Sequence, residues 1–229
     1  MKPKNLKCPF TWRNRYVLIQ DRVWYVPEYY DAFDQFTFPG WNSPDFFGND
    51  RPVHIEYCSG NGDWIIQKAQ QFPEFNWVAV EKQFQRVRKI WSKAQNHNIS
   101  NLIIVSGEGY TVSHHYIPDQ TVSEVYVNFP DPWPKERHKK HRIIQPRFTQ
   151  EIGRILKDNG KFALATDDPN YSREMIEVLQ QTPGFASCYP DPFYVSEEEG
   201  YGSSWFEELW RKKGFSIRYH QFQKRDSSS

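Results

Sequence analysis

Segments with the pattern of a β-strand alternate with segments that have helical spacing from Pro52 onward. The first pair is VHIEYC at 53–58 and DWIIQKAQQF at 63–72. Regular alternation of strands and helices predicts an α/β fold with a mostly parallel sheet and helices on both of its faces. The remaining predicted strands lie at 76–81, 101–107, 123–129 and 160–167, and the remaining predicted helices at 83–97, 146–157 and 169–182.

The C-terminal part of the chain breaks this alternation. GFASCY is followed by an acidic, Gly-rich loop, a helical pattern at 203–214 and the strand-like FSIRYHQFQ. We expect the two last strands to form an antiparallel edge of the sheet. A chain of 229 residues suits one sizeable α/β domain. The predicted organisation is an aromatic extension packed on the domain at 1–50, the domain itself at 51–224, and a disordered tail at 225–229.

Composition and charge limit the function. The net charge is only +1, so a nucleic-acid surface would have to come from clustered cations. The three cysteines are widely spaced and lack a metal-ligand pattern, which favours reduced thiols. No signal-peptide core is found at the start, and no apolar run reaches the ~18 residues of a membrane helix. We therefore expect a soluble, cytoplasmic protein that works without a membrane, as a monomer or a homodimer.

The sequence EYCSGNGD ends the first predicted strand, at the sheet edge where such folds bind ligands. Gly60 and Gly62 allow a tight turn and close approach of a ligand to the backbone, and Glu56 lies at the strand end. Glu81 ends the second predicted strand, where a carboxylate can accept hydrogen bonds from both hydroxyls of a ribose. A dinucleotide site would need a third glycine where the chain has Ile65, so the pattern favours S-adenosylmethionine over NAD. The alternative is an ordinary strand–helix turn with a surface glutamate.

Two further strand ends carry carboxylates. Glu108 follows the third predicted strand, where it could bond an adenine amino group or lie in an exposed loop. The fourth strand ends in NFPDPW, whose Pro130 and Pro132 cannot continue a strand because proline lacks the amide donor. The rigid turn presents Asp131 and Trp133 where a substrate base would meet a cofactor. Trp133 could stack on that base or be buried under the segment that follows.

The segment after the turn, KERHKKHR, has five full positive charges within eight residues and only one acidic residue, Glu136. A charge run is usually a solvated face of the protein. The scarcity of acid and the position beside the predicted site instead favour contact with RNA phosphates. The predicted RNA contacts are Arg137, His138, Lys139, Lys140, His141 and Arg142.

Together these motifs resemble the bacterial tRNA (guanine-N7-)-methyltransferases of the TrmB type. The likeness covers the chain from about Gly48 to Phe222, and FPDPWPKERHKKHR is its most specific part. It implies the class I S-adenosylmethionine-dependent methyltransferase fold, a Rossmann-like seven-stranded sheet, which makes 51–224 a methyltransferase domain. It also implies transfer of a methyl group from S-adenosylmethionine to N7 of a guanine in the tRNA variable loop, without a metal.

The resemblance carries over to individual residues. It implies that Asp131 is the catalytic position. The cofactor-binding residues that it implies are Glu56, Gly60, Gly62, Glu81, Glu108 and Asp131. The substrate-binding residues that it implies are Lys135, Asp167, Ser204, Trp205, Phe206 and Glu207.

Three positions depart from the family pattern. The family usually has glycine where this chain has Cys58, and aspartate where it has Glu108. Its late Thr-Lys-Phe-Glu motif reads Ser-Trp-Phe-Glu here, so that Trp205 replaces the lysine.

Guanine N7 has an in-plane lone pair and needs no deprotonation, so the main work of such an enzyme is alignment. A carboxylate at Asp131 or Asp167 could stabilise the cationic product or hold the N1–H and amino edge of the base. One alternative is a methyltransferase for exocyclic amino groups of RNA or DNA, but its turn would need two adjacent prolines. The other is a non-catalytic RNA-binding subunit, against which the retained carboxylates argue.

Overall fold

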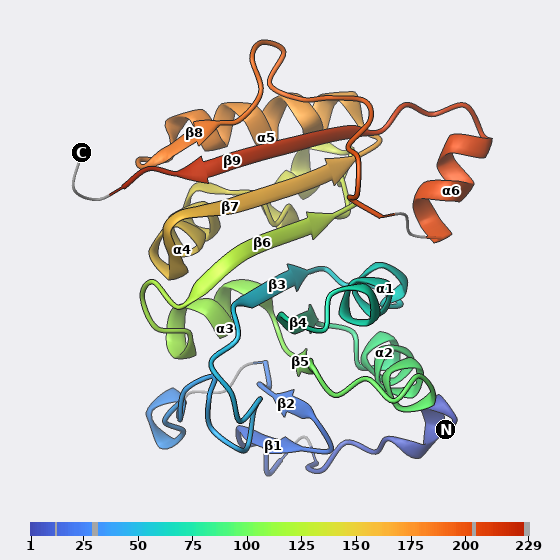
Figure 1. The fold of residues 1–229 in the computed structure, drawn as a ribbon, viewed down its shortest axis with the longest axis vertical. Helices are drawn as coiled ribbons and strands as arrows, with labels where there is room; N and C mark the ends of the chain where they lie inside the picture. Colours follow the sequence, from blue (N-terminus) through green and yellow to red (C-terminus); the bar gives the residue numbers. More distant parts are fainter. Residues whose placement is uncertain (12, 29–31, 203–204, 227–229) are drawn as a thin grey trace. The chain divides into compact units, whose positions relative to one another are not determined.

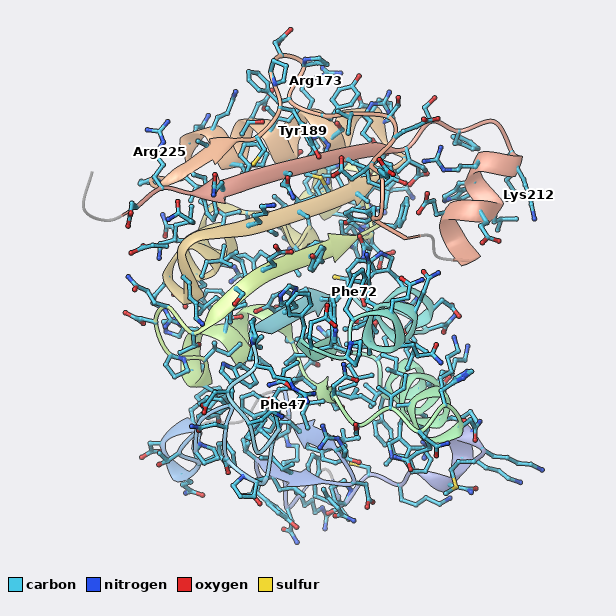
Figure 2. All side chains as sticks on the ribbon, viewed as in Figure 1. Phe47, Phe72, Arg173, Tyr189, Lys212 and Arg225 are labelled. Atoms are coloured by element: carbon cyan, nitrogen blue, oxygen red, sulfur yellow. The ribbon has the colours of Figure 1, made fainter. Side chains whose placement is uncertain are left out.

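The structure is a computed structural model of the chain and describes residues 1–11, 13–28, 32–202 and 205–226. The chain forms two compact units, Met1–Ile117 (unit 1) and Pro118–Ser229 (unit 2). In Figure 1, unit 1 runs from blue to green and unit 2 from green to red. Figure 2 adds the side chains to this view, with Phe47 and Phe72 labelled in unit 1 and Arg173 and Tyr189 in unit 2. The described residues include no helix that is long and apolar enough to cross a membrane.

The sheet of unit 1 has the strand order β1-β2-β5-β4-β3. Neighbouring strands are parallel, except that β1 is antiparallel to β2. All residues of β3 and β4 are buried, as expected for parallel strands that are covered on both faces. The strands are β1 (Leu18–Gln20), β2 (Val23–Tyr25), β3 (Val53–Tyr57), β4 (Asn76–Glu81) and β5 (Leu102–Ser106).

Two of the helices of unit 1 pack against its sheet: α1 against β4, and α2 against β4 and β5. The amphipathic pattern of α2 buries Val87, Ile90 and Trp91 on the face that meets the sheet. The helical segments of unit 1 are η1 (Pro3–Asn5), η2 (Phe33–Gln35), α1 (Asp63–Gln71), α2 (Phe84–Asn96) and α3 (Gly109–Tyr116).

The sheet of unit 2 has the order β6-β7-β9-β8. β6 and β7 are parallel, whereas β9 is antiparallel to both β7 and β8. The helices α4 and α5 contact each other, and both pack against β7. The elements of unit 2 are β6 (Val122–Asn128), η3 (Glu136–His141), α4 (Pro146–Ile155), β7 (Leu156–Thr166), α5 (Pro169–Gln181), β8 (Phe185–Ser187), α6 (Trp205–Lys212) and β9 (Arg218–Lys224).

The structure confirms the predicted α/β fold, the mostly parallel pairing and the antiparallel edge. Among the described residues, seven strands, β3 to β9, fall within 51–224, and two short strands precede them. The N-terminal residues therefore do more than pack on the domain, because β2 pairs with β5 in the sheet of unit 1. The limits of the domain at 51 and 224 stay a prediction, and most of the proposed tail, 227–229, lies outside the described residues.

Candidate active site

The glycine turn after β3 is held by Glu81 from the end of β4. One carboxylate oxygen of Glu81 accepts the Gly60 N–H at 2.9 Å, and the other accepts the Gln83 N–H at 2.7 Å. Gly62 has a φ of 78°, and a Cβ there would lie 2.8 Å from Ile90 of α2. Glycine is thus required at position 62 both by its conformation and by the close approach of α2.

Cys58 occupies the first position of this turn with a φ of 60°. This is the left-handed region, in which a residue with a side chain costs about 1–3 kcal/mol. The conformation explains why glycine is the usual residue at this position in the family. The departure therefore changes the side chain while the turn itself is retained.

Glu81 is buried, with 4% of its surface exposed. Burial raises the pKa of its carboxyl group, while hydrogen bonds from Gln83 and Gly60 and the charge of Arg86, 3.9 Å away, act in the opposite direction. A carboxylate has about four lone-pair sites, so Glu81 can accept ligand hydrogen bonds in addition to those from the backbone. The chemistry of this group therefore fits the two ribose hydroxyls of an adenosine moiety.

The other two predicted cofactor carboxylates differ in their surroundings. Glu56 is buried on β3. Glu108 caps the N-terminus of α3: its oxygens accept hydrogen bonds from the N–H groups of Tyr110 and Thr111 and from the Thr111 hydroxyl. Capping a helix gives Glu108 a structural function that the sequence pattern did not predict. Its contact with an adenine stays a prediction.

The NFPDPW turn at the end of β6 is held at its start. Tyr201 donates a hydrogen bond to the buried side chain of Asn128 at 2.6 Å, and the Phe129 N–H donates to the Ala165 carbonyl of β7 at 2.8 Å. Asp131 and Trp133 are exposed beyond these contacts. The first residues of the turn are therefore fixed to the fold, and the turn presents Asp131 to solvent.

The basic segment forms η3, which follows the turn. Lys135, Arg137 and Lys140 are exposed, and Lys139 pairs with Glu136 at 2.6 Å. The ring of Trp133 packs against His138 at 5.7 Å and His141 at 5.2 Å between ring centroids. Trp133 is thus partly covered by the basic segment and remains 36% exposed.

Arg142 lies in a different environment from the one expected. It is buried, with 6% of its surface exposed, and its guanidinium contacts Glu174 and the backbone of the NFPDPW turn. A guanidinium that is enclosed in this way presents very little of its surface to a phosphate. The structure thus argues against the RNA contact predicted for Arg142. The local sequence gave no sign of its burial, because the residues before it are all polar.

The loop after β7 carries two adjacent carboxylates. Asp167 is half-buried, and burial, together with the neighbouring charge of Asp168, raises its pKa. Asp168 instead caps α5 by accepting the N–H groups of Asn170 and Tyr171, both at 2.8 Å. Asp167 is therefore the carboxylate of this loop that remains for a substrate.

The late Ser-Trp-Phe-Glu motif is described only in part. Ser204 lies outside the described residues, and Trp205 and Phe206 begin α6. Glu207 is buried and accepts hydrogen bonds from the Tyr219 hydroxyl at 2.5 Å and the Arg211 Nε at 3.0 Å. In this structure Glu207 anchors α6 to β9, and its predicted contact with substrate remains untested.

Comparisons with known proteins agree with this arrangement. Residues 50–218 match the family model described as "Putative methyltransferase". The tRNA (guanine-N(7)-)-methyltransferase of Chlamydia caviae is 49% identical over 225 residues, which cover 98% of this chain and 99% of that protein. The enzyme of the same name from Vibrio cholerae is 33% identical over 75% of this chain and 72% of its own length.

A likeness to solved structures supports the fold. The crystal structure of the 16S rRNA methyltransferase KamB superposes with a TM-score of 0.58, at 16% identity over 80% of this chain and 94% of that one. The predicted class I methyltransferase fold is thereby confirmed. By its full-length similarity to the enzymes from Chlamydia and its match to the family model, the chain belongs to the tRNA (guanine-N7-)-methyltransferase family.

Proposed function

We propose that this chain transfers the methyl group of S-adenosylmethionine to N7 of a guanine in the variable loop of tRNA. The single observation that carries this proposal is the 49% identity over 98% of the chain with an enzyme of that name. The FPDPWPKERHKKHR segment adds the most specific motif of the family. Because tRNA is a molecule of the cytoplasm, we place the protein there.

Residues of unit 1 are proposed to hold the cofactor. Glu81 is the acceptor for the ribose hydroxyls, because its buried carboxylate is fixed by Gly60 and Gln83. Glu56 and the turn at Gly60 and Gly62 are the further cofactor contacts that the family resemblance implies. When bound, S-adenosylmethionine supplies an electrophilic methyl group.

Residues of unit 2 are proposed to hold the guanine. N7 needs no general base, so these side chains align the base and respond to its developing positive charge. Asp131 is exposed on its turn and is proposed to stabilise that charge. Asp167 has the raised pKa of a half-buried carboxyl group and is proposed to bind the N1–H and amino edge of the base.

The tRNA backbone is proposed to contact the exposed cations of the basic segment. The relevant side chains are Lys135, Arg137 and Lys140, for which no carboxylate partner is recorded among the described residues. Exposed cations release bound counterions from RNA when they meet phosphates, which makes affinity depend on salt. Lys139, His138 and His141 complete the proposed surface.

The experiment that tests this function is nucleoside mass spectrometry of tRNA incubated with the protein and labelled S-adenosylmethionine. We expect label in N7-methylguanosine. That nucleoside is cationic, so borohydride followed by aniline cleaves the chain at the modified position. Labelled tRNA that resists cleavage would instead indicate methylation of an exocyclic amine, and absence of label would indicate a non-catalytic protein.

A further inference from the structure

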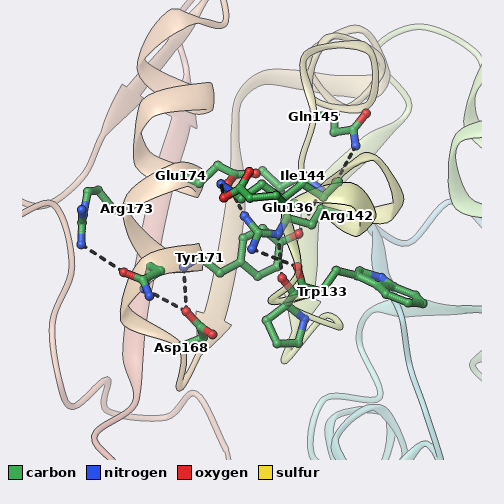
Figure 3. Close-up of polar contacts among 12 residues, drawn as sticks. Trp133, Glu136, Arg142, Ile144, Gln145, Asp168, Tyr171, Arg173 and Glu174 are labelled. Carbon is green, nitrogen blue, oxygen red and sulfur yellow. Dashed lines mark hydrogen bonds and ion pairs between the residues drawn. The ribbon is translucent and has the colours of Figure 1, made fainter.

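The buried side chain of Arg142 connects to the NFPDPW turn through the backbone. Its Nε donates to the Pro132 carbonyl at 2.6 Å, and its Nη2 donates to the Trp133 carbonyl at 3.3 Å (Figure 3). Its Nη1 pairs with the carboxylate of Glu174 on α5. One guanidinium thus joins the turn after β6 to the helix that follows β7.

Tyr171 supports Arg142 from the other side. The guanidinium carbon lies 4.8 Å from the centre of the Tyr171 ring, and the Tyr171 side chain is fully buried. The Tyr171 hydroxyl accepts a hydrogen bond from the Ile144 N–H at 3.3 Å. The backbone N–H of Tyr171 donates to the carboxylate of Asp168, which caps α5. Figure 3 shows the Arg142 side chain beside that of Tyr171, with its bonds to the turn dashed. We call Arg142, Tyr171 and Glu174 the Arg142 clamp.

The turn needs support of this kind because of its own sequence. Phe129 and Trp133 flank it with φ angles of 47° and 41°, in a region that residues with side chains rarely adopt. Pro130 and Pro132 have no N–H groups with which to close the turn internally. Such a conformation persists only where its surroundings impose it. Phe129 is fixed by its bond to β7, and the Arg142 clamp fixes the other end.

We propose that Arg142 is a positioning residue for methyl transfer, held by Glu174 and Tyr171, that fixes the Pro130–Trp133 turn and so the orientation of Asp131. The catalytic consequence of this inference, the effect on methyl transfer, rests on the proposed function. It gives the last arginine of the basic segment a function that is separate from RNA binding. It also links Asp131 to the Asp167–Asp168 loop, because the Asp168 cap positions the helix turn that carries Tyr171.

The test uses two conservative variants in the full chain, each with a matched control. Arg142→Lys keeps the charge but loses the planar fork that reaches two carbonyls and a carboxylate together. Glu174→Gln keeps an acceptor but removes the charge. The controls are Arg173→Lys and Glu177→Gln, which change exposed residues of α5, the helix that carries Glu174. The Arg173 side chain points toward Asn170 and away from the clamp (Figure 3).

The first measurement separates positioning from binding. Single-turnover methylation at saturating tRNA and S-adenosylmethionine should slow on the order of 10²-fold in Arg142→Lys, as expected for misplaced reacting groups. Calorimetric affinity for tRNA should stay within about twofold of the wild type, and S-adenosylmethionine is kept saturating because Asp131 is also a predicted cofactor contact. The two control variants should keep the wild-type rate.

The second measurement reports the turn itself. The protein is labelled with 5-fluorotryptophan, and the Trp133 resonance is assigned with Trp133→Phe. Both clamp variants should shift or broaden this ¹⁹F resonance, while the other tryptophan resonances and the melting temperature stay near those of the wild type. A wild-type rate together with an unchanged Trp133 resonance in both variants would overturn the proposal.

Loss of folding has a separate reading. If Arg142→Lys loses its affinity for both ligands and has a lowered melting temperature, Glu174→Gln provides the test. A slow methylation rate with retained tRNA binding in Glu174→Gln supports the positioning function, and a wild-type rate rejects it. Failure of the proposed function is also distinguishable. A wild-type protein that forms no N7-methylguanosine would reject that function, whereas the Trp133 resonance needs no turnover and would still report whether the clamp holds the turn.

Discussion

The Glu81 carboxylate accepts a hydrogen bond from the Gly60 N–H, 2.9 Å away, so that the end of one strand fixes the glycine turn of its neighbour. β3 and β4 are parallel neighbours, which places both groups at the carboxyl edge of the unit 1 sheet. The carboxylate therefore has two functions in the proposed site. It shapes the glycine turn, and we propose that it also offers its remaining lone pairs to the ribose of the cofactor.

Glu81→Ala should weaken binding of S-adenosylmethionine through loss of the ribose hydrogen bonds. Bonds to a charged acceptor contribute on the order of 1.5–3 kcal/mol, which is roughly 10–10²-fold in affinity. Isothermal titration calorimetry measures this directly. Glu74→Ala, an exposed glutamate of the same unit, is the control. Wild-type affinity in the Glu81 variant would remove this residue from the proposed site.

Binding of S-adenosylmethionine should also depend on pH through Glu81. Burial raises the pKa of its carboxyl group in the free protein, and the charged form is the one that accepts both hydroxyls. Affinity should therefore fall as the pH drops through this raised pKa and level off above it. Titrations from neutral to mildly acidic pH should show the fall in the wild type, and Glu81→Gln should lack it. Equal pH dependence in both proteins would assign the effect to another group.

Lys135 and Lys140 should contribute to the salt dependence of tRNA affinity. Each phosphate contact that is lost should lower the slope of log affinity against log salt by about 1. We leave Arg142 intact in this test because its guanidinium is buried against Glu174 and the turn. The double change to glutamine is compared with Lys157→Gln, an exposed lysine at the start of β7. Lower affinity with an unchanged slope would contradict phosphate contact.

Much of this fold was predictable because the hydrophobic pattern of each strand or helix is local. The predicted strand 76–81 agrees with β4, and the helix at 169–182 differs from α5 by one residue. The helix α3, Gly109–Tyr116, was not predicted, because its residues have weak helix propensity and its cap is glutamate in place of Ser, Thr, Asp or Asn. The strand β2 was not predicted either, because a three-residue strand in an aromatic-rich segment has no period to detect.

The location of a candidate residue was predictable where that residue lies at a strand end, and its contacts were not predictable where the partners are distant in sequence. Glu81 ends β4 and Asp131 lies in the turn after β6, so both could be chosen as candidates from position alone. Arg142 could not be distinguished from its basic neighbours, since its burial depends on Glu174 and Tyr171, some thirty residues later in the chain. The cap formed by Glu108 likewise required the unpredicted helix α3.

His220 should make the stability of the fold depend on pH. It is buried on β9 between Ser172 and the Phe193 carbonyl, each 3.1 Å from one ring nitrogen, and burial lowers its pKa from 6.5 to about 4. Between these values the unfolded chain binds a proton that the folded chain excludes. Stability should therefore fall as the pH drops from 6.5 toward 4, by up to about 3 kcal/mol, and be insensitive to this group above 6.5.

His220→Gln keeps hydrogen-bonding capacity but does not titrate. Urea unfolding of the variant should show a shallower loss of stability than the wild type over the same pH range. His97, exposed after α2, gives the control His97→Gln, which should retain the wild-type dependence. An equally steep loss in the His220 variant would show that carboxylates elsewhere cause the acid sensitivity.

Asp131→Asn should separate charge from shape at the proposed catalytic position. Methylation at N7 makes the purine cationic and requires no proton acceptor, so a carboxylate can act only through its charge or its hydrogen bonds. The amide keeps the shape and one acceptor oxygen but removes the charge. We expect the single-turnover rate to fall roughly 10²–10³-fold, because electrostatic stabilisation of the transition state is lost.

Affinity for S-adenosylmethionine is measured alongside, because Asp131 is also a predicted cofactor contact. Asp45→Asn, an exposed aspartate of unit 1, is the control and should keep the wild-type rate. A rate loss of only a few-fold with unchanged cofactor affinity would show that Asp131 orients the base without stabilising its charge. Asp167→Asn then becomes the decisive comparison. The half-buried carboxyl group of Asp167, which has a raised pKa, would be the remaining candidate for the electrostatic role. Asp167→Asn should then show a larger loss of rate than Asp131→Asn.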